Sequence, residues 1–371
     1  MNSNANPDRL NLTVDESAAI HSALTELGWI APEQHILSLS PAGEGNMNRT
    51  LRVNLTDSRG KPSSLVLKQA VPFVAKYPDI PAPIQRCRSE ADFYRVTSGT
   101  AAVAQCMPRL FGFDPERHLL CFEDLGAAGD FTDLYQPASA AAGFPSADAG
   151  SEEPLPSQAL KALLTWLGNL HSLPLEPGDW PTLSNLAMRE LNHQHIFELP
   201  LAPDNDLELD QVTPGLSAEA QRLKADAELV AATRTLGALY LAPVTASAVL
   251  LHGDFYPGSW LRGERNVWVI DPEFGFFGPR EFDLGVFIAH AHFAQISTRA
   301  IDAALNDYAT ACAPNANGPT VGFDRGLAEA FAGVEIMRRL LGVAQLPLEA
   351  DLAQKRVWLD QAETWLARYE H

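Results

Sequence analysis

The hydrophobic pattern of the chain changes near residue 125, and this change constrains the fold more than any other feature. Before it, short segments of strand type alternate with turn signals, and one helical segment at roughly 84–98 interrupts them. After it, apolar residues recur mainly at helical spacing. We therefore expect an α+β chain with two lobes. A small antiparallel β-sheet lobe with one inserted helix spans 1–125, and a larger, mostly helical lobe spans 126–371.

Turn and cap signals place the elements of the first lobe. Thr13-Val-Asp-Glu16 is a capping-box pattern and Gly28 is a helix stop signal, so a first helix is expected across about 14–27. The expected strands are Ile36–Ser40, Thr50–Leu55, Ser64–Lys68, a segment near Leu110, and His118–Phe122.

The second lobe reads as helices around a short β-type region. Five leucines from Leu160 to Leu170 recur at helical spacing and predict a helix that faces a core. Residues 136–157 are rich in Ala, Ser, Pro and Gly and predict a flexible loop or linker. Residues 248–273 read as strand, loop, strand, loop. The other expected helices are 185–197, 216–240, 281–294, 298–311, 323–345 and 351–369.

The charge balance excludes two classes of partner. The 371 residues carry 46 acidic and 27 basic side chains, a net charge of −19, of which −17 falls after residue 125. Such a chain lacks the positive surface that binding to nucleic acid or to anionic lipid requires. Four cysteines without a CxxC pair, a polar N-terminus and no long apolar run predict a cytoplasmic protein without a membrane span.

The most informative residues are two acids, each of which follows a short β-type segment. Asp254 lies in Leu251-His-Gly-Asp254, and Asp271 lies 17 residues later in Ile270-Asp-Pro-Glu273. Phosphoryl transfer needs one carboxylate that accepts the proton of the attacking hydroxyl and another that holds the magnesium ion. A single aspartate at a strand end more often caps a turn, but the joint pattern favours the phosphoryl-transfer interpretation.

The first lobe offers complementary parts for a nucleotide. Gly43 and Gly45, with Asn46 and Asn48, lie between two expected strands, where glycines let backbone N–H groups approach phosphates. This signal is weak alone, because Gly-Glu-Gly is a common turn.

Lys68 ends an apolar strand, where a lysine is costly unless it pairs with an anion, and Glu90 in the following helix is the natural partner. Glu123 and Leu125 lie at the expected junction of the lobes, where an adenine would meet backbone groups.

The order of these motifs resembles the aminoglycoside phosphotransferase and choline kinase superfamily, which shares the protein-kinase-like fold. Within it, the chain is most similar to the 5-methylthioribose kinases, over roughly residues 38–346. The similar segments are Gly45-Asn-Met-Asn48, Leu67–Phe73, His252-Gly-Asp254 with Gly258-Ser259, Ile270–Pro279 with Phe282-Asp-Leu-Gly285, and Arg338-Arg339 with Gly342-Val-Ala.

The resemblance implies an ATP-dependent small-molecule kinase that uses Mg²⁺ and transfers a phosphoryl group to an alcohol. Asp254 would be the catalytic base, Asp271 and Glu273 would hold magnesium, and Arg338 and Arg339 would stabilise the phosphoryl group or grip the acceptor. The implied nucleotide-binding residues are Gly43, Gly45, Asn46, Asn48, Lys68, Glu90, Glu123, Leu125 and Ser259. Serine at position 259 replaces the asparagine of most superfamily members but agrees with the methylthioribose kinases.

Two differences from the methylthioribose kinases leave the identity of the acceptor substrate open. The methylthioribose kinases have Leu-His-Thr where this chain has Phe255-Tyr256-Pro257, and their Gly-Glu-Ser-Trp-Pro loop corresponds to Lys76–Pro81 without the tryptophan. The acceptor is therefore a 5-methylthioribose-like sugar or another small alcohol. An acidic cluster (Asp204, Asp206, Glu208, Asp210) in an expected loop would serve solubility or, if it rims the pocket, favour a cationic acceptor.

Alternative functions are separated by further features. One alternative is a nucleotide-binding protein of the same fold that has no kinase activity. Such proteins usually lose one of the residues that correspond to Lys68, Glu90, Asp254 and Asp271, all of which are present here. A protein kinase is disfavoured because Phe282 follows Asp271 too soon for an activation loop. The His-x-His pairs His193/His195 and His290/His292 would point to different helix faces, which argues against a shared metal. The resemblance also implies a homodimer, which the sequence itself does not reveal.

Overall fold

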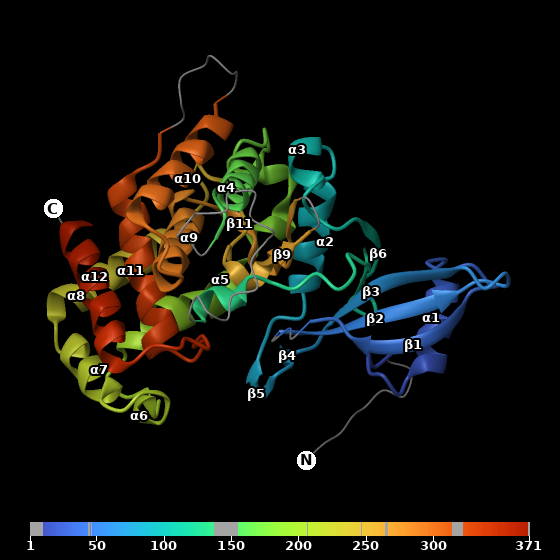
Figure 1. The fold of residues 1–371 in the computed structure, drawn as a ribbon, viewed down its shortest axis with the longest axis horizontal. Coiled ribbons are helices and arrows are strands. Elements are labelled where there is room, and N and C mark those ends of the chain that lie inside the picture. Colours follow the sequence, from blue (N-terminus) through green and yellow to red (C-terminus); the bar gives the residue numbers. More distant parts are fainter. Residues whose placement is uncertain are drawn as a thin grey trace. The chain divides into compact units, whose positions relative to one another are not determined.

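The computed structural model describes residues 10–43, 45, 47–136, 155–205, 207–245, 247–263, 266–313 and 322–369 (Figure 1). The chain divides into two compact units, Met1–Ala127 and Ala128–His371. Most of the predicted insert over 136–157, together with Asn46 and Asp206, lies outside the described residues. Within the described part of the chain, no helix combines the length and apolarity that crossing a membrane requires.

The N-terminal unit is built on a five-stranded antiparallel sheet of order β1-β2-β3-β7-β6. Its strands are β1 (His35–Pro41), β2 (Asn48–Thr56), β3 (Pro62–Ala70), β6 (Leu110–Asp114) and β7 (Leu119–Glu123). All five expected strands are therefore present. A two-stranded ribbon of β4 (Phe73–Val74) and β5 (Tyr77–Pro81) and the short helix α3 (Ala101–Ala104) were not expected.

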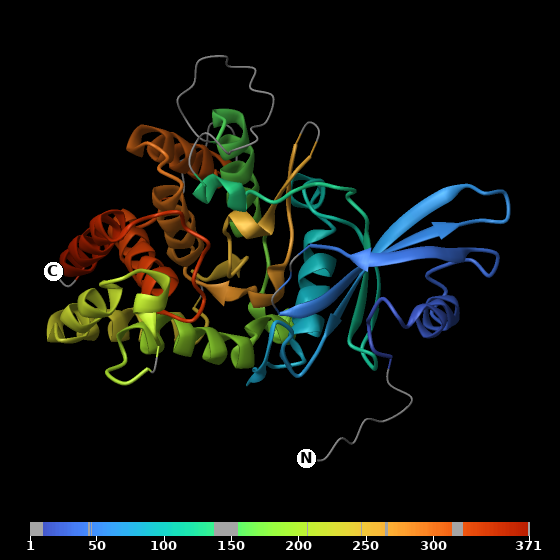
Figure 2. The same ribbon diagram turned by 60° about the horizontal axis from the view of Figure 1, so that its bottom comes forward.

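Helices cover both faces of this sheet (Figure 2). Apolar side chains that alternate along β2 and β3, such as Val53 and Leu67, pack with Ile20 and Leu24 of α1 (Ser17–Glu26) into a core. Lys68 follows Leu67 along the strand, so its side chain points to the opposite face, toward α2 (Arg86–Thr97). The alternation of β3 thus delivers one lysine to the face that α2 covers.

The first helix starts later than the capping-box pattern predicts. Thr13 does not cap it; its carbonyl oxygen instead accepts the Glu16 N–H in a turn, and the helix begins at Ser17. The stop signal was right, because Gly28 has φ +68° directly after the helix end.

The C-terminal unit is mostly helical. Its main helices are α4 (Ser157–His171), α5 (Leu186–His193), α7 (Leu216–Lys224), α8 (Ala227–Leu241), α9 (Glu281–Phe293), α10 (Thr298–Ala311), α11 (Arg325–Leu341) and α12 (Leu352–Tyr369). The single helix expected over 216–240 is wrong, because two helices meet at Asp226. The Asp226 carboxylate accepts the N–H groups of Glu228 and Leu229 and starts α8 as an N-cap.

Two pairs of three-residue strands hold the acid-bearing loops. β8 (Val249–Leu251) pairs with β11 (Phe276–Gly278), and β9 (Trp260–Arg262) pairs with β10 (Val267–Val269), all antiparallel. His252 to Asp254 follow β8, and Asp271 follows β10 by two residues. Each acid therefore leaves a buried strand at its carboxyl end, as the sequence pattern predicted.

Candidate active site

Lys68 and Glu90 form a buried ion pair in the N-terminal unit. The Lys68 Nζ donates to the Glu90 Oε1 over 2.9 Å, and the side chains are only 7% and 2% exposed. β3 presents the lysine and α2 presents the glutamate, which is the pairing that the sequence predicted. A buried lysine held by a carboxylate has a fixed position, as a phosphate-binding lysine requires.

The predicted glycine loop is only partly described. Gly43 and Gly45 are exposed, and Gly43 has the positive φ of +80° that suits glycine. Asn48 differs from the expectation, because it is buried and its Oδ1 accepts a hydrogen bond from the Arg86 Nε over 3.1 Å. Arg86 in turn donates to three backbone carbonyls, those of Met47, Val71 and Pro83, so Asn48 contributes to anchoring this loop on α2.

Glu123 and Leu125 lie at the end of β7, where the sequence placed them. The Glu123 carboxylate accepts the backbone N–H of Arg109 over 3.2 Å, and Leu125 is half-buried. Sequence reasoning missed Asp124 between them. Burial acts to raise its pKa, but hydrogen bonds, that of Arg52 foremost, hold the pKa of Asp124 below its usual range, so it fixes the segment as a carboxylate.

A buried carboxylate, that of Asp283, binds the backbone of the His252-Gly-Asp254 loop. Asp283 of α9 is fully buried and accepts the backbone N–H groups of His252 over 2.7 Å and of Gly253 over 2.9 Å. It also contacts the His171 Nε2 over 3.1 Å. These bonds fix the backbone on which Asp254 stands.

The same loop is tied to the segment that carries Asp271. The His252 Nε2 donates to the Ile270 carbonyl over 2.9 Å, which leaves its Nδ1 to accept the backbone N–H of Asp254 at 3.4 Å. Gly253 has φ +84°, and a Cβ there would lie 2.2 Å from the Phe274 carbonyl oxygen. Only glycine fits this approach, so the loops of the two predicted acids pack directly against each other.

Asp271 and Glu273 share a tight turn. Asp271 adopts φ +61° and ψ +49°, a left-handed conformation that few non-glycine residues accept. The Asn185 side chain donates to the Glu273 carbonyl over 2.9 Å and to that of Gly275 over 3.0 Å, which holds the turn.

This turn has the right donors for magnesium. Within the described residues, no three His, Cys, Asp or Glu side chains form a metal-binding cluster. Two carboxylates nevertheless fit Mg²⁺, which takes one or two of them and completes its shell with water and phosphate oxygens.

Ser259 is buried and its hydroxyl serves the loop. It donates to the Asp254 carbonyl over 3.0 Å, and the Ser259 carbonyl accepts the Ile270 N–H over 3.0 Å. Its hydroxyl proton therefore stabilises the loop of Asp254 instead of pointing to a ligand.

The Asp254 carboxylate lies against the two predicted arginines of α11. Its Oδ1 accepts the Arg338 Nη1 over 3.3 Å and the Arg339 Nη2 over 3.1 Å. Its Oδ2 has no hydrogen-bond partner among the described residues. One carboxylate oxygen is thus held by the two arginines, and the other has no such partner in the described part of the chain.

Two buried residues behind the arginines were missed by sequence reasoning. Glu335 pairs with Arg339 over 2.6 Å and with Arg338 over 3.2 Å, and His290 contacts the Glu335 Oε1 over 3.1 Å. The signal for Glu335 was available, because a glutamate three and four residues before two arginines forms helical ion pairs. His290 was interpreted as a core or surface histidine, and nothing in the sequence links it to α11.

The departures at 255–257 have different consequences. Phe255 is fully buried and stacks on Trp166 with ring centroids 5.7 Å apart, so it belongs to the core. The Pro257 carbonyl accepts the Phe131 N–H. Tyr256 contacts the arginine pair of α11, with its ring centroid 4.8 Å from the Arg339 guanidinium carbon.

Asp210 of the acidic cluster and His292 of the second histidine pair have contacts that stabilise the fold. Asp210 lies in the short helix α6 (Leu209–Val212), not in a loop, and accepts the N–H groups of Gly215 and Ser217 at the start of α7. His292 packs edge-on against Trp365, whereas the His290 Nε2 contacts the Glu335 Oε1.

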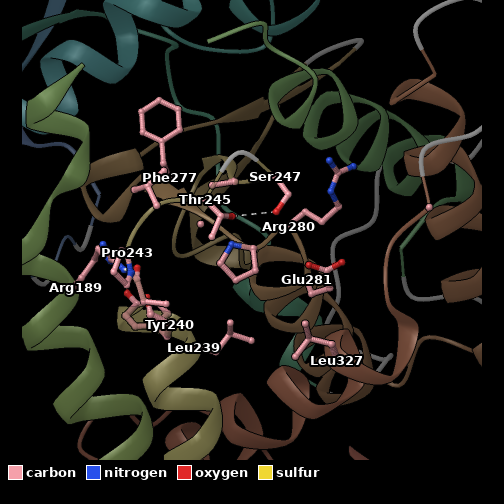
Figure 3. Close-up of a pocket in the computed structure, with 16 residues that line it drawn as sticks. Arg189, Leu239, Tyr240, Pro243, Thr245, Ser247, Phe277, Arg280, Glu281 and Leu327 are labelled. Atoms are coloured by element: carbon pink, nitrogen blue, oxygen red, sulfur yellow. Dashed lines mark hydrogen bonds between the residues drawn. The ribbon is translucent and has the colours of Figure 1, made fainter. Parts of the chain in front are cut away.

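A cavity of about 470 Å³ lies at the other end of β8 (Figure 3). Residues before β8, such as Thr245 and Ser247, and residues after β11, such as Arg280, line it. None of the predicted site residues does. Arg189 at its edge donates to the carbonyls of Tyr240 and Ala242 and so ends α8, which gives it a structural role.

Comparisons with known proteins find a matching family and similar enzymes. A model of the phosphotransferase enzyme family matches residues 38–319. The methylthioribose kinase of Exiguobacterium sibiricum is 27% identical over 88% of this chain and 84% of its own length. That of Bacillus pumilus is 24% identical over 95% of this chain and 92% of its own length.

A solved spectinomycin phosphotransferase, in complex with ADP and spectinomycin, has the same fold. The TM-score is 0.51 with 13% identity, over 95% of this chain and 98% of that one. The expected α+β, protein-kinase-like fold is confirmed. Because the family model covers about three quarters of the chain and the curated relatives extend the likeness over nearly all of it, this chain belongs to the phosphotransferase enzyme family, as a methylthioribose kinase-like enzyme that acts on an alcohol group.

Proposed function

We propose that this enzyme transfers the γ-phosphoryl group of ATP to a hydroxyl group of a 5-methylthioribose-like sugar. The observation that carries the proposal is the state of Asp254. Two arginines hold its Oδ1, while its Oδ2 has no partner among the described residues and a seventh of the side chain is exposed. A carboxylate so arranged is suited to act as the base that accepts the hydroxyl proton.

The roles of the other residues follow from their chemistry. Lys68, fixed by Glu90, contacts ATP phosphates in the N-terminal unit, and Gly43, Gly45 and the segment from Glu123 to Leu125 contribute to nucleotide binding. Asp271 and Glu273 hold Mg²⁺, which when bound neutralises charge on the phosphates. The resemblance also implies a dimer, which we retain as a prediction.

The charges at the base give no preference for a cationic acceptor. The carboxylates of Asp254 and Glu335 are balanced by Arg338 and Arg339, so this cluster has no excess negative charge to attract a cation. Asp210, one of the acidic residues that would favour a cationic acceptor if they rimmed the pocket, has its carboxylate bound to backbone N–H groups. The names of the curated relatives agree with a methylthioribose acceptor.

One observation favours a different small alcohol as the second candidate. Tyr256 replaces the histidine of the methylthioribose kinases at the position that contacts Arg339. A change at this point alters the surroundings of the base itself, so the acceptor can differ while the chemistry stays the same.

A coupled ADP-release assay on the full chain with MgATP tests both candidates. The panel holds methylthioribose, ribose, choline, homoserine and an aminoglycoside. We expect turnover with methylthioribose and none with choline or the aminoglycoside. Turnover with another neutral alcohol alone would support the second candidate. Magnesium-dependent ATP binding without ADP release on the whole panel would contradict the proposed kinase activity.

A further inference from the structure

A buried arginine lines the cavity at the far end of β8. Arg189 is only 5% exposed, and Figure 3 shows it on one side of the cavity, with Arg280 on the other. Its Nη2 donates to the carbonyls of Tyr240 and Ala242. Its Nη1 donates to none of the described residues and, unlike the Nε, is not sealed off by protein atoms. Arg189 therefore keeps a donor that a ligand in the cavity can reach.

The positive charge of Arg189 has no counter-ion in the described part of the chain. The guanidinium group packs on the Phe276 ring instead, with its carbon 4.7 Å from the ring centroid. Burial lowers the pKa of Arg189, which is the direction expected for a cation that is desolvated without a carboxylate beside it. Because an unpaired buried charge is costly, an anionic group at the Nη1 would stabilise this side chain.

The walls of the cavity suit a small organic molecule. Its volume of about 470 Å³ lies within the range of about 300–1,000 Å³ that is typical of small-molecule pockets. Leu239, Val244 and Phe277 supply apolar surface. Thr245 and Ser247 are exposed and share one hydrogen bond over 3.0 Å, so one of their two hydroxyl protons has no acceptor among the described residues. The cavity thus combines an apolar surface with donors and offers few acceptors.

The charges on the opposite wall leave a positive balance. Arg280 forms no ion pair with a described carboxylate, and its Nη1 lies 4.0 Å from the Cys312 Sγ. Glu281 is the one acid among the described lining residues, and its Oε1 accepts the Asp324 N–H over 3.0 Å. Together with Arg189, the lining carries two positive charges and one negative charge, so it favours a ligand with a single negative charge.

We propose that this cavity is a second ligand site, which binds a small organic carboxylate. The carboxylate accepts a hydrogen bond from the Arg189 Nη1, and the apolar body of the ligand lies along Leu239, Val244 and Phe277. Such a ligand supplies the counter-ion that the buried guanidinium lacks.

The proposed site is separate from the site of Asp254. In the β8–β11 pair, Val249 lies opposite Gly278 at the cavity end, and Leu251 lies opposite Phe276 at the end from which the Asp254 loop leaves. We therefore expect binding in the cavity to be independent of nucleotide, and the inference does not rest on the proposed kinase function.

The probe for this site is hexanoate, and hexan-1-ol is its uncharged counterpart of the same length. Saturation-transfer NMR on the full chain detects binding of each probe, and titration gives the Kd with and without MgADP. Hexanoate should bind at least about tenfold more tightly than hexan-1-ol, because only the carboxylate can pair with the guanidinium group. Saturating MgADP should not displace it.

Two variants locate the binding. Arg189→Met removes the charge and keeps the length of the side chain, and Ser247→Trp places a large ring at the exposed edge of the cavity while Arg189 stays in place. Each should weaken hexanoate binding by at least about tenfold, so the test does not depend on one variant folding. Arg234→Met is the control, because it removes an exposed arginine from α8 and should leave the Kd within about twofold.

Four results would overturn the proposal. They are the absence of hexanoate binding to the wild type, equal affinity for hexan-1-ol, displacement by MgADP, and an unchanged Kd in Ser247→Trp.

Discussion

Four charged side chains meet at the candidate base, and their charges cancel. Asp254 and Glu335 are carboxylates, Arg338 and Arg339 are guanidinium groups, and each carboxylate contacts both arginines. Hydrogen bonds among them repay part of the desolvation cost of burying four charges. Among the described residues, the Arg338 Nε and the Asp254 Oδ2 have no hydrogen-bond partner, so this cluster has a donor and an acceptor that the protein does not use.

The buried pair in the N-terminal unit leads to a first prediction. Glu90→Gln takes the buried carboxylate from Lys68, and breaking a buried ion pair typically costs about 3–5 kcal/mol. We expect a lower urea midpoint for the N-terminal unit and a raised KM for ATP, with the acceptor KM unchanged.

Asp92→Asn is the control for this prediction, because it removes a charge from the same helix at a pair with Arg95, whose side chain is half exposed. If Glu90→Gln behaves like this control in both stability and KM, the Lys68–Glu90 pair does not position the nucleotide.

At the scale of elements, the packing of α9 on α11 links the loop of Asp254 to the paired arginines. α9 carries Asp283, which holds the His-Gly-Asp loop, and α11 carries the arginines. Gly285 lets the helices approach: a Cβ there would lie 2.5 Å from the Phe331 Cβ and 2.8 Å from the Ala328 carbonyl oxygen. Moving backbone atoms to make room for a Cβ would cost free energy, so the close spacing of the two helices depends on glycine at position 285.

Gly285→Ala should therefore destabilise the C-terminal unit by about 1–3 kcal/mol through overpacking, visible as a lower urea midpoint. Gly326→Ala on α11 is the matched control, because that position is exposed and alanine favours a helix. A midpoint for Gly285→Ala at or above that of the control would contradict the packing argument.

Helices and strands long enough to show a repeating hydrophobic pattern were predictable from the sequence, and very short strands were not. The leucine stripe from Leu160 to Leu170 predicted α4, and the cost of a lysine in an apolar strand predicted the pairing of Lys68 with Glu90. β4 and β11 have two and three residues, too few to show a period. The break at Asp226 was readable as an N-cap but was hidden within a continuous apolar pattern.

The sequence predicted the motif residues of the site but not the contacts between residues that are far apart in the chain. Motif residues such as Asp254 and Arg338 are recognisable in the sequence because of their neighbours. His290 joins α9 to Glu335 on α11, 45 residues away, and only the packing of the helices brings them together. The same holds for Asn48, whose contact with Arg86 depends on how α2 lies on the sheet.

At the scale of the whole molecule, the C-terminal unit is built around neutral histidines. Burial lowers the pKa of each of His171, His195, His252, His290 and His292, that of His290 to about 4. In the unfolded chain a histidine has a pKa of about 6.5. At a pH between this value and the lowered pKa of each folded histidine, the unfolded chain binds protons that the folded unit does not. Acidification therefore favours unfolding.

We therefore expect the stability of the C-terminal unit to fall as the pH drops from about 6.5 toward 4. Urea midpoints followed by tryptophan emission at pH 7.5, 6 and 5 check this, since Trp166 and Trp260 are buried in that unit. His290→Gln should make the dependence shallower. Midpoints that stay constant or rise on acidification would show that these histidines are not held neutral.

The most direct measurement is the turnover of Asp254→Asn, which keeps the shape of the side chain and its Oδ1 acceptor but removes the base. With MgATP and the acceptor that the wild type uses, we predict that kcat falls by about 1,000-fold or more, because no group accepts the hydroxyl proton. MgADP affinity by calorimetry should stay within about twofold, since the base does not hold the nucleotide. Turnover within tenfold of the wild type would contradict the assignment of Asp254 and with it the account of this site.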